Sequence, residues 1–177
     1  MSSPFSLRPA APFDAESIAR IHVQSWRESY PGIIPDNELA GLSVFERATR
    51  WRHILTLPAA DQGTFVAARD GALLGFGDCG RQRSQVLPFV GEVNALYVLK
   101  DSQRAGVGRA LMAVMAEHLL ACRINSASLW VIKENAPARK FYEALGGRAV
   151  AEKDDRRTGY TLREVAYGWE DVRALLV

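Results

Sequence analysis

Several features that mark particular classes of protein are scarce in this sequence. The chain of 177 residues contains only two cysteines, Cys79 and Cys122, with no CxxC pair and no histidine cluster beside them. This pattern excludes a disulfide framework, gives no support to a zinc site, and favours a reducing, cytoplasmic setting. We therefore expect no metal.

Long hydrophobic runs and a strong charge of one sign are also missing. Nowhere do about 18 apolar residues follow one another, as a spanning helix would need. The first residues lack the basic and apolar regions of a secretory signal. With 22 basic and 20 acidic residues, the formal net charge is only +2. The sequence therefore predicts neither a membrane nor a nucleic-acid partner, and any basic site must be local.

What remains is the composition of a typical globular protein. Apolar residues make up 48% of the chain and charged residues 24%. The length is close to that of one domain and suffices for a sizeable core. No repeat, low-complexity segment or linker divides the chain, so we expect a single domain over residues 1–177.

The first third of the chain predicts one short strand and two helices. The strand covers residues 5–8, and Asp14 stands where the N-cap of the first helix is expected. Ser43 and Glu46 have the spacing of a capping box at the start of the second helix. The segment between the helices, residues 31–42, is expected to be a loop.

From residue 64 onward the apolar period changes to two, which is typical of strands. Asp70-Gly71 lies between two apolar runs and is a strong hairpin signal. Further strands are predicted over residues 89–99, 126–132, 148–153 and 160–169, with helices after the first two and a loop over residues 154–159. The fold class is therefore α/β, or α+β, with a mixed sheet that is parallel where a helix joins two strands.

The segment "DSQRAGVGRALM", residues 101–112, lies between a predicted strand and a predicted helix. The first N–H groups of a helix have no partner within it, and the helix dipole adds partial positive charge. Gly106 and Gly108 allow a ligand to approach the backbone, while Arg104 and Arg109 add cationic donors. Two interpretations stay open, a phosphate-binding site and a tight turn with solvated arginines.

Spacing excludes two familiar phosphate loops. A Walker loop needs Lys-Ser/Thr after its second glycine, but Arg109-Ala110 follows Gly108. The dinucleotide fingerprint needs a third glycine at the position of Leu111. Neither a nucleoside triphosphatase nor an ordinary NAD site is predicted.

The residues from Gln103 to Gly108 match the Q/R-x-x-G-x-G/A motif of the GNAT acetyltransferase superfamily. The strand before them and the later segment "LWVIKENAPARKFYEALGG", with Asn135, Ala138, Phe141 and Tyr142, also resemble that superfamily, as does "SWRESYPGIIP" near the start. The resemblance covers nearly the whole chain. It implies a mostly antiparallel, twisted sheet with a splayed parallel pair at its centre and helices on both faces.

The resemblance also implies acetyl-CoA as co-substrate and a set of residues that bind it. The loop would hold the pyrophosphate, the preceding strand would bond to the pantetheine arm, and Asn135 would lie near the cofactor. The implied residues are Leu96, Tyr97, Val98, Gln103, Arg104, Ala105, Gly106, Val107, Gly108, Arg109 and Asn135. A backbone N–H near Val98 would meet the developing oxyanion.

Two residues are candidates for proton transfer. An alkylammonium has a pKa of about 10.4, so a base must take its proton at neutral pH. Glu92 stands where similar enzymes often carry this base, although it could be a strand-end residue in an ion pair. Tyr142 matches the tyrosine that protonates the leaving thiolate, although it could be a core aromatic. Asp78 is the reserve candidate for the base.

The acceptor site is the least defined part of the prediction. By analogy Trp26 and Tyr30 would line it together with the "PGIIP" loop, and we also place Asp78 there; Trp26 could equally belong to the core. The predicted reaction is acetyl transfer to a primary amine of a small molecule, by direct attack in a ternary complex. The alternatives are a non-catalytic CoA-binding module and an enzyme that acetylates protein amines, and a homodimer stays open.

Overall fold

The structure, a computed structural model, describes residues 5–176 of the chain. Residues 1–4 and Val177, the ends of the expected single domain, lie outside the described residues. A seven-stranded sheet forms the centre, with the strand order β1-β2-β3-β4-β5-β7-β6. The strands are β1 (Ser6–Pro9), β2 (Gly63–Arg69), β3 (Ala72–Arg81), β4 (Gly91–Val98), β5 (Ala127–Ile132), β6 (Arg148–Arg157) and β7 (Tyr160–Trp169).

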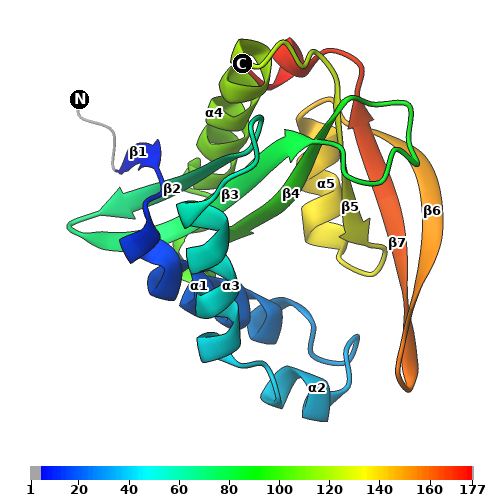
Figure 1. Cartoon of the computed structure of the whole chain (residues 1–177). Helices are drawn as coiled ribbons and strands as arrows, with labels where there is room; N and C mark the ends of the chain where they lie inside the picture. The colour runs from blue at the N-terminus through cyan, green and yellow to red at the C-terminus, as the bar shows by residue number, and fades with distance from the viewer. Residues whose placement is uncertain (1–4, 177) are drawn as a thin grey trace.

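Helices cover both faces of this sheet (Figure 1). The α-helices are α1 (Ala15–Ser29), α2 (Asp36–Ala40), α3 (Val44–Thr56), α4 (Val107–Ala121) and α5 (Ala136–Ala144). Three short 3-10 helices are η1 (Pro12–Asp14), η2 (Lys100–Ser102) and η3 (Val172–Leu176). Helices α1 and α3 pack on one face of the sheet, around Val66 and Phe76. Helices α4 and α5 pack on the opposite face, around Leu129 and Val165.

Local sequence signals account for most of these boundaries. The hydroxyl of Ser43 accepts a hydrogen bond from Glu46 N at 3.2 Å and caps α3. Asp70 and Gly71 both have positive φ, 50° and 81°, as the predicted two-residue hairpin turn requires. Asp14 stands at the start of α1 as expected, but its carboxylate bonds to Arg8 and to Ala11 N instead of capping the helix.

Three details differ from the sequence prediction. Helix α2 lies within the segment expected to be a loop, and none of the three 3-10 helices was predicted. Residues 154–157 belong to strand β6, so that the turn to β7 consists of Thr158 and Gly159 only. Strand β6 is an exposed edge strand with polar side chains on both faces. Its sequence therefore lacks the apolar alternation that predicts a strand, and pairing with β7 holds it in place.

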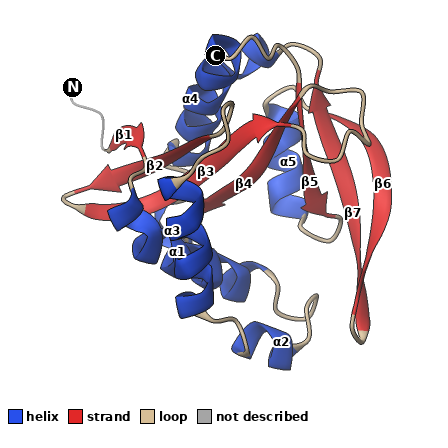
Figure 2. Cartoon of the chain, viewed as in Figure 1, coloured by secondary structure: helices blue, strands red, loops and turns tan. Residues whose placement is uncertain are grey.

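The predicted splay at the centre of the sheet is present. All neighbouring strands pair antiparallel except β4 and β5, which are parallel. This pair has only two registered positions, Gly91 with Ala127 and Glu92 with Ser128. Beyond them the two strands separate, as Figure 2 shows. The edge of β4 that faces β5 is therefore available for other hydrogen bonds over residues 93–98.

Candidate active site

The glycine loop forms the N-terminal end of α4. Gly106 is the N-cap residue with φ 84°, and Arg104 also has positive φ, 60°. The first backbone bond of the helix joins Ala110 N to Gly106 O at 3.0 Å. The N–H groups of Val107 and Gly108 thus belong to the helix end, where no intrahelical acceptor exists. A left-handed residue just before the N-terminus of a helix lets successive backbone N–H groups point into a concavity that can bind an anion.

The two glycines have different reasons to lack a side chain. A Cβ on Gly106 would find nothing within 4 Å, so its requirement is the positive φ. A Cβ on Gly108 would lie 3.2 Å from the ring of Phe141 on α5. Gly108 therefore allows α5 to approach the start of α4, while Gly106 shapes the loop itself. The loop is also tied to β4, because Gln103 Nε2 donates to Val98 O at 3.1 Å.

Aromatic side chains from three elements gather around the splay. Trp26 Nε1, on α1, donates to the hydroxyl of Tyr97 on β4 at 3.0 Å. Asn135, at the start of α5, donates from Nδ2 to the hydroxyl of Tyr30 at 3.4 Å. Its Oδ1 accepts from Ala138 N at 3.2 Å, which confirms that it caps α5. The two residues expected at the acceptor site thus contact two residues expected at the cofactor.

Tyr142 lies within this group as a buried residue of α5. Its ring packs near Phe141, Tyr167 and Trp169, so it is a core aromatic. Burial raises the pKa of its hydroxyl, and the nearby Tyr30 and Tyr97 raise it further. That hydroxyl makes no hydrogen bond to any other described residue. The phenol is therefore protonated at neutral pH and keeps its proton available to a ligand, so that the packing and donor roles are compatible.

Glu92 lies at the closed end of the splay, where β4 still pairs with β5. Its side chain is 12% exposed, and Oε1 lies 3.5 Å from Nη2 of Arg83. Oε2 accepts a long hydrogen bond, 3.4 Å, from Arg83 N. The ion-pair interpretation of this strand-end glutamate therefore has a partner in Arg83, although both contacts are at the long end of their range.

Asp78, the reserve candidate, is enclosed. It is only 2% exposed, and its carboxylate accepts from Gln62, from Thr64 at 2.6 Å and from Asn94 at 2.8 Å. Burial raises its pKa, and these three donors partly oppose the rise. Asn94 is the extra residue of a bulge in β4, between the pairs Asp78–Ala95 and Cys79–Val93. Asp78 therefore holds the bulge that bends β4 near the splay.

A surface hollow lies next to the loop that precedes α2. Its volume is about 330 Å³, and it opens between this loop and the hairpin of β6 and β7. Its lining residues are Gly32, Ile33, Ile34, Pro35, Asp36 and Tyr160. Four residues of the "PGIIP" segment, which is expected at the acceptor site by analogy, thus line this hollow.

Sequence reasoning missed several polar residues on the face that carries α1 and α3. Arg47 of α3 lies over the Trp26 ring at 5.2 Å, and its Nη1 is 3.3 Å from Nε2 of His22. On the other side of the splay, Glu164 of β7 lies 3.2 Å from Lys153, whose Nζ is 4.1 Å from the centroid of the partly buried Trp130 ring. Only the sheet order brings these residues to one face.

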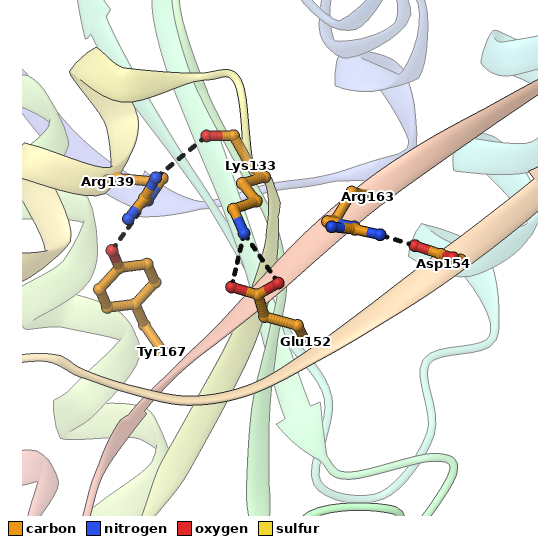
Figure 3. A network of polar contacts seen from close by, with 6 residues as sticks. All are labelled: Lys133, Arg139, Glu152, Asp154, Arg163 and Tyr167. Atoms are coloured by element: carbon orange, nitrogen blue, oxygen red, sulfur yellow. Dashed lines mark hydrogen bonds and ion pairs between the residues drawn. The ribbon is translucent and has the colours of Figure 1, made fainter.

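Arg139 of α5 makes two hydrogen bonds to neighbouring residues. It donates to the hydroxyl of Tyr167 at 3.1 Å and to Lys133 O at 3.2 Å (Figure 3). Lys133 pairs in turn with Glu152 at 2.8 Å. These bonds, drawn in Figure 3, join α5 to the strands beyond the splay.

Residues 5–176 contain neither a cluster of metal-ligand side chains nor a membrane-spanning helix. No group of three or more His, Cys, Asp and Glu side chains in this part of the chain could hold a metal ion. Among the same residues, no helix combines the length and apolar character needed to cross a bilayer.

The fold and the glycine loop are those of a class of acyl-group transferases, and comparison with known proteins gives the family. The model of the "Acetyltransferase (GNAT) family" matches residues 17–147. The chain therefore belongs to the GNAT acetyltransferase family, as the motif at residues 103–108 predicted.

Relatives support the same assignment. The chain is 39% identical to an uncharacterised N-acetyltransferase of Bacillus subtilis, YuaI, over 96% of this chain and 95% of that protein. It is 33% identical to a mycothiol acetyltransferase of Frankia casuarinae over 62% of this chain but only 30% of that protein. Among solved structures, the PaiA N-acetyltransferase of Thermoplasma acidophilum, in complex with coenzyme A, has a TM-score of 0.70 at 18% identity and covers 93% of this chain and 98% of its own.

Proposed function

We propose that this protein transfers an acetyl group from acetyl-CoA to a primary amine of a small molecule, in a ternary complex of both substrates. One observation supports this most directly. The splay between β4 and β5 opens beside a left-handed loop at a helix N-terminus. Next to it lies the buried residue Tyr142, whose hydroxyl has no hydrogen-bond partner among residues 5–176. This combination offers a phosphate cradle, a strand edge and a proton donor at one place.

The residues present suit coenzyme A. The N–H groups at the start of α4, with Arg104 beside them, would hold its pyrophosphate. The open edge of β4, including Leu96 to Val98, would bond to the pantetheine arm as an added strand does. Bound there, acetyl-CoA supplies an activated thioester. Gly106, with open space around its Cα, would let the backbone come close to the phosphates.

The chain supplies proton transfer on both sides of the reaction. Glu92 takes the proton of the substrate ammonium, directly or through a water molecule. Tyr142, protonated at neutral pH, donates its proton to the sulfur as the C–S bond breaks and the sulfur gains negative charge. A backbone N–H near Val98 donates to the acyl oxygen as it gains charge. Trp26 and Tyr30 line the acceptor side, and Asp78 supports the bulge of β4.

Two measurements test this proposal. Coenzyme A is titrated calorimetrically into the wild-type protein and into Arg104→Glu, and free thiol release from acetyl-CoA is followed against polyamines, aminoglycosides, amino acids and peptides. We expect measurable heat that Arg104→Glu reduces, and thiol release with at least one small amine. Binding without turnover would favour the non-catalytic module, turnover with peptides alone would favour a protein substrate, and identical titrations without heat would refute the proposal.

A further inference from the structure

Arg47 is a half-buried cation without a carboxylate partner among residues 5–176. Its contacts are the face of Trp26 and the ring of His22, and the ion pairs of the described residues do not include it. Burial lowers its pKa, and the positive charges of Arg50 and Arg157 act in the same direction. A guanidinium in this position gains more from an anion than one exposed to water.

A second observation comes from the donors around His22. Trp51 Nε1 lies 3.3 Å from Nδ1 of this ring, and Arg47 Nη1 lies 3.3 Å from Nε2. Trp51 and Arg47 are donors only. His22 is neutral because burial, with help from Arg47 and Arg50, lowers its pKa to about 3. A neutral imidazole has one N–H and one lone pair on its two ring nitrogens. In one of the two contacts, therefore, the ring N–H points at the N–H of Trp51 or Arg47, and no hydrogen bond forms there.

An added acceptor would resolve this conflict. If Trp51 uses the lone pair on Nδ1, the ring N–H is on Nε2 and points toward Arg47. Two donors then converge on one place, and a carboxylate there can accept from both. The place is adjacent to β4, because His22 stacks on Tyr97 at 4.6 Å between ring centroids. Trp26, which lies under Arg47, also bonds to Tyr97.

We propose that the acceptor carries a carboxylate as well as its amine, and that Arg47 and His22 bind this carboxylate. This inference rests on the proposed acetyl transfer and narrows its substrate to small amino acids or compounds like them. Arginine suits the role because its planar guanidinium binds a carboxylate with two parallel hydrogen bonds. Arg47 is thus a residue that determines specificity, while the proton transfers stay with Glu92 and Tyr142.

The first test compares substrates that differ in the carboxylate alone. Thiol release from acetyl-CoA is measured with the 20 protein amino acids and with their primary amides, which keep the amine and remove the charge. We expect at least one amino acid to have a kcat/KM at least tenfold above that of its amide. O-Phosphoethanolamine and β-alanine are compared in the same way, and a preference for the phosphate would overturn the carboxylate assignment.

The second test uses Arg47→Gln with Arg52→Gln as its matched control, since Arg52 is an exposed arginine of the same helix. Arg47→Gln should lower kcat/KM for the preferred amino acid at least tenfold and leave the amide unchanged, whereas Arg52→Gln should change neither. Arg47→Lys keeps the charge without the planar fork and should fall between them. Thermal unfolding shows whether each variant is folded, and the amide comparison needs no variant.

A binding measurement separates this inference from the proposed function. The N-acetyl derivatives of the same amino acids, and their amides, are titrated calorimetrically into the wild-type protein and Arg47→Gln. Carboxylate-dependent binding that Arg47→Gln weakens at least tenfold would support the subsite even without turnover. Three results would overturn the carboxylate subsite and leave the transferase proposal standing. The acids and amides could bind equally, or no acid could bind. Alternatively, uncharged and polycationic amines could be turned over at rates that Arg47→Gln does not change.

Discussion

The substitution Gly106→Ala tests whether the shape of the loop before α4 anchors coenzyme A. Gly106 has φ 84°, and a Cβ added there would meet nothing within 4 Å. The substitution thus adds backbone strain without a clash. A left-handed conformation costs an L-residue about 1–2 kcal/mol, and the smaller freedom of alanine in the unfolded chain offsets about 0.4–1 kcal/mol of this. We expect a loss of about 1 kcal/mol, or a Tm about 2–4 °C lower for this chain length.

Gly71 provides the control, because it has φ 81° and equally open surroundings, but lies in the hairpin of β2 and β3. Gly71→Ala should lower the Tm of the free protein by a similar amount and leave coenzyme A binding unchanged. In Gly106→Ala the loop relieves part of its strain by relaxing in the free protein, and only this part must be restored when coenzyme A binds. Each 1 kcal/mol of strain relieved in this way weakens binding about 5-fold.

Thermal unfolding and calorimetric titration of coenzyme A give both quantities for each variant. The decisive quantity is the difference in Kd between two variants of similar stability. If Gly106→Ala binds coenzyme A as tightly as the wild-type protein, or if Gly71→Ala weakens binding as much, the loop geometry is not the anchor. The proposed cofactor site would then be wrong.

Three further predictions concern protons. Tyr142→Phe should lower kcat about 10²–10⁴-fold. Tm and coenzyme A affinity should change little, because the lost hydroxyl has no partner among the described residues. A large loss of stability with unchanged kcat would show that Tyr142 is a packing residue only. Glu92→Gln should lower the rate of acetyl transfer at neutral pH, and the rate should recover as the pH rises toward the amine pKa of about 10.4. The exposed residue Glu16 of α1 provides the control, and Glu16→Gln should behave as the wild-type protein. A rate deficit of Glu92→Gln that is independent of pH would contradict the role of base. Burial lowers the pKa of His22 to about 3, below its ordinary 6.5. Between these pH values the unfolded chain binds a proton that the folded protein does not. The free energy of unfolding should therefore fall by up to about 1.4 kcal/mol per pH unit as the pH drops below 6.5. Urea denaturation between pH 7 and 4.5 should show that His22→Gln removes this part of the slope and that exposed His53→Gln does not; equal slopes in both variants would contradict the buried, neutral state of His22.

Most helices and strands could be predicted from short-range patterns in the sequence. The hairpin turn at Asp70-Gly71, the cap at Asn135 and the glycine loop each depend on the backbone requirements of a few adjacent residues. The prediction failed where short-range pattern was weak. Residues 154–157 are polar on both faces and were predicted as a loop, because pairing with β7, not side-chain alternation, makes them a strand.

Resemblance to the GNAT family placed residues in roles but did not give their surroundings. Two interpretations were left open at Glu92 and at Tyr142, and the structure supplies the surroundings of each residue. Glu92 lies near Arg83, and Tyr142 lies among other aromatic rings. Asp78 was expected near the substrate, and the structure surrounds it with three donors at the bulge of β4. Its role on the substrate side therefore stays a prediction.

The sequence by itself determined the order of the seven strands and of helices α1, α3, α4 and α5, the glycine loop before α4 and the family, because these depend on residues that are neighbours along the chain. Only the tertiary structure decided that β4 and β5 separate after two pairs, that Tyr30, Tyr97 and Tyr142 meet there, and that Arg47 and His22 face each other without an acceptor. The physical reason is that such meetings depend on sheet order and helix packing, which join segments far apart in the chain and leave no periodic signal in any one of them.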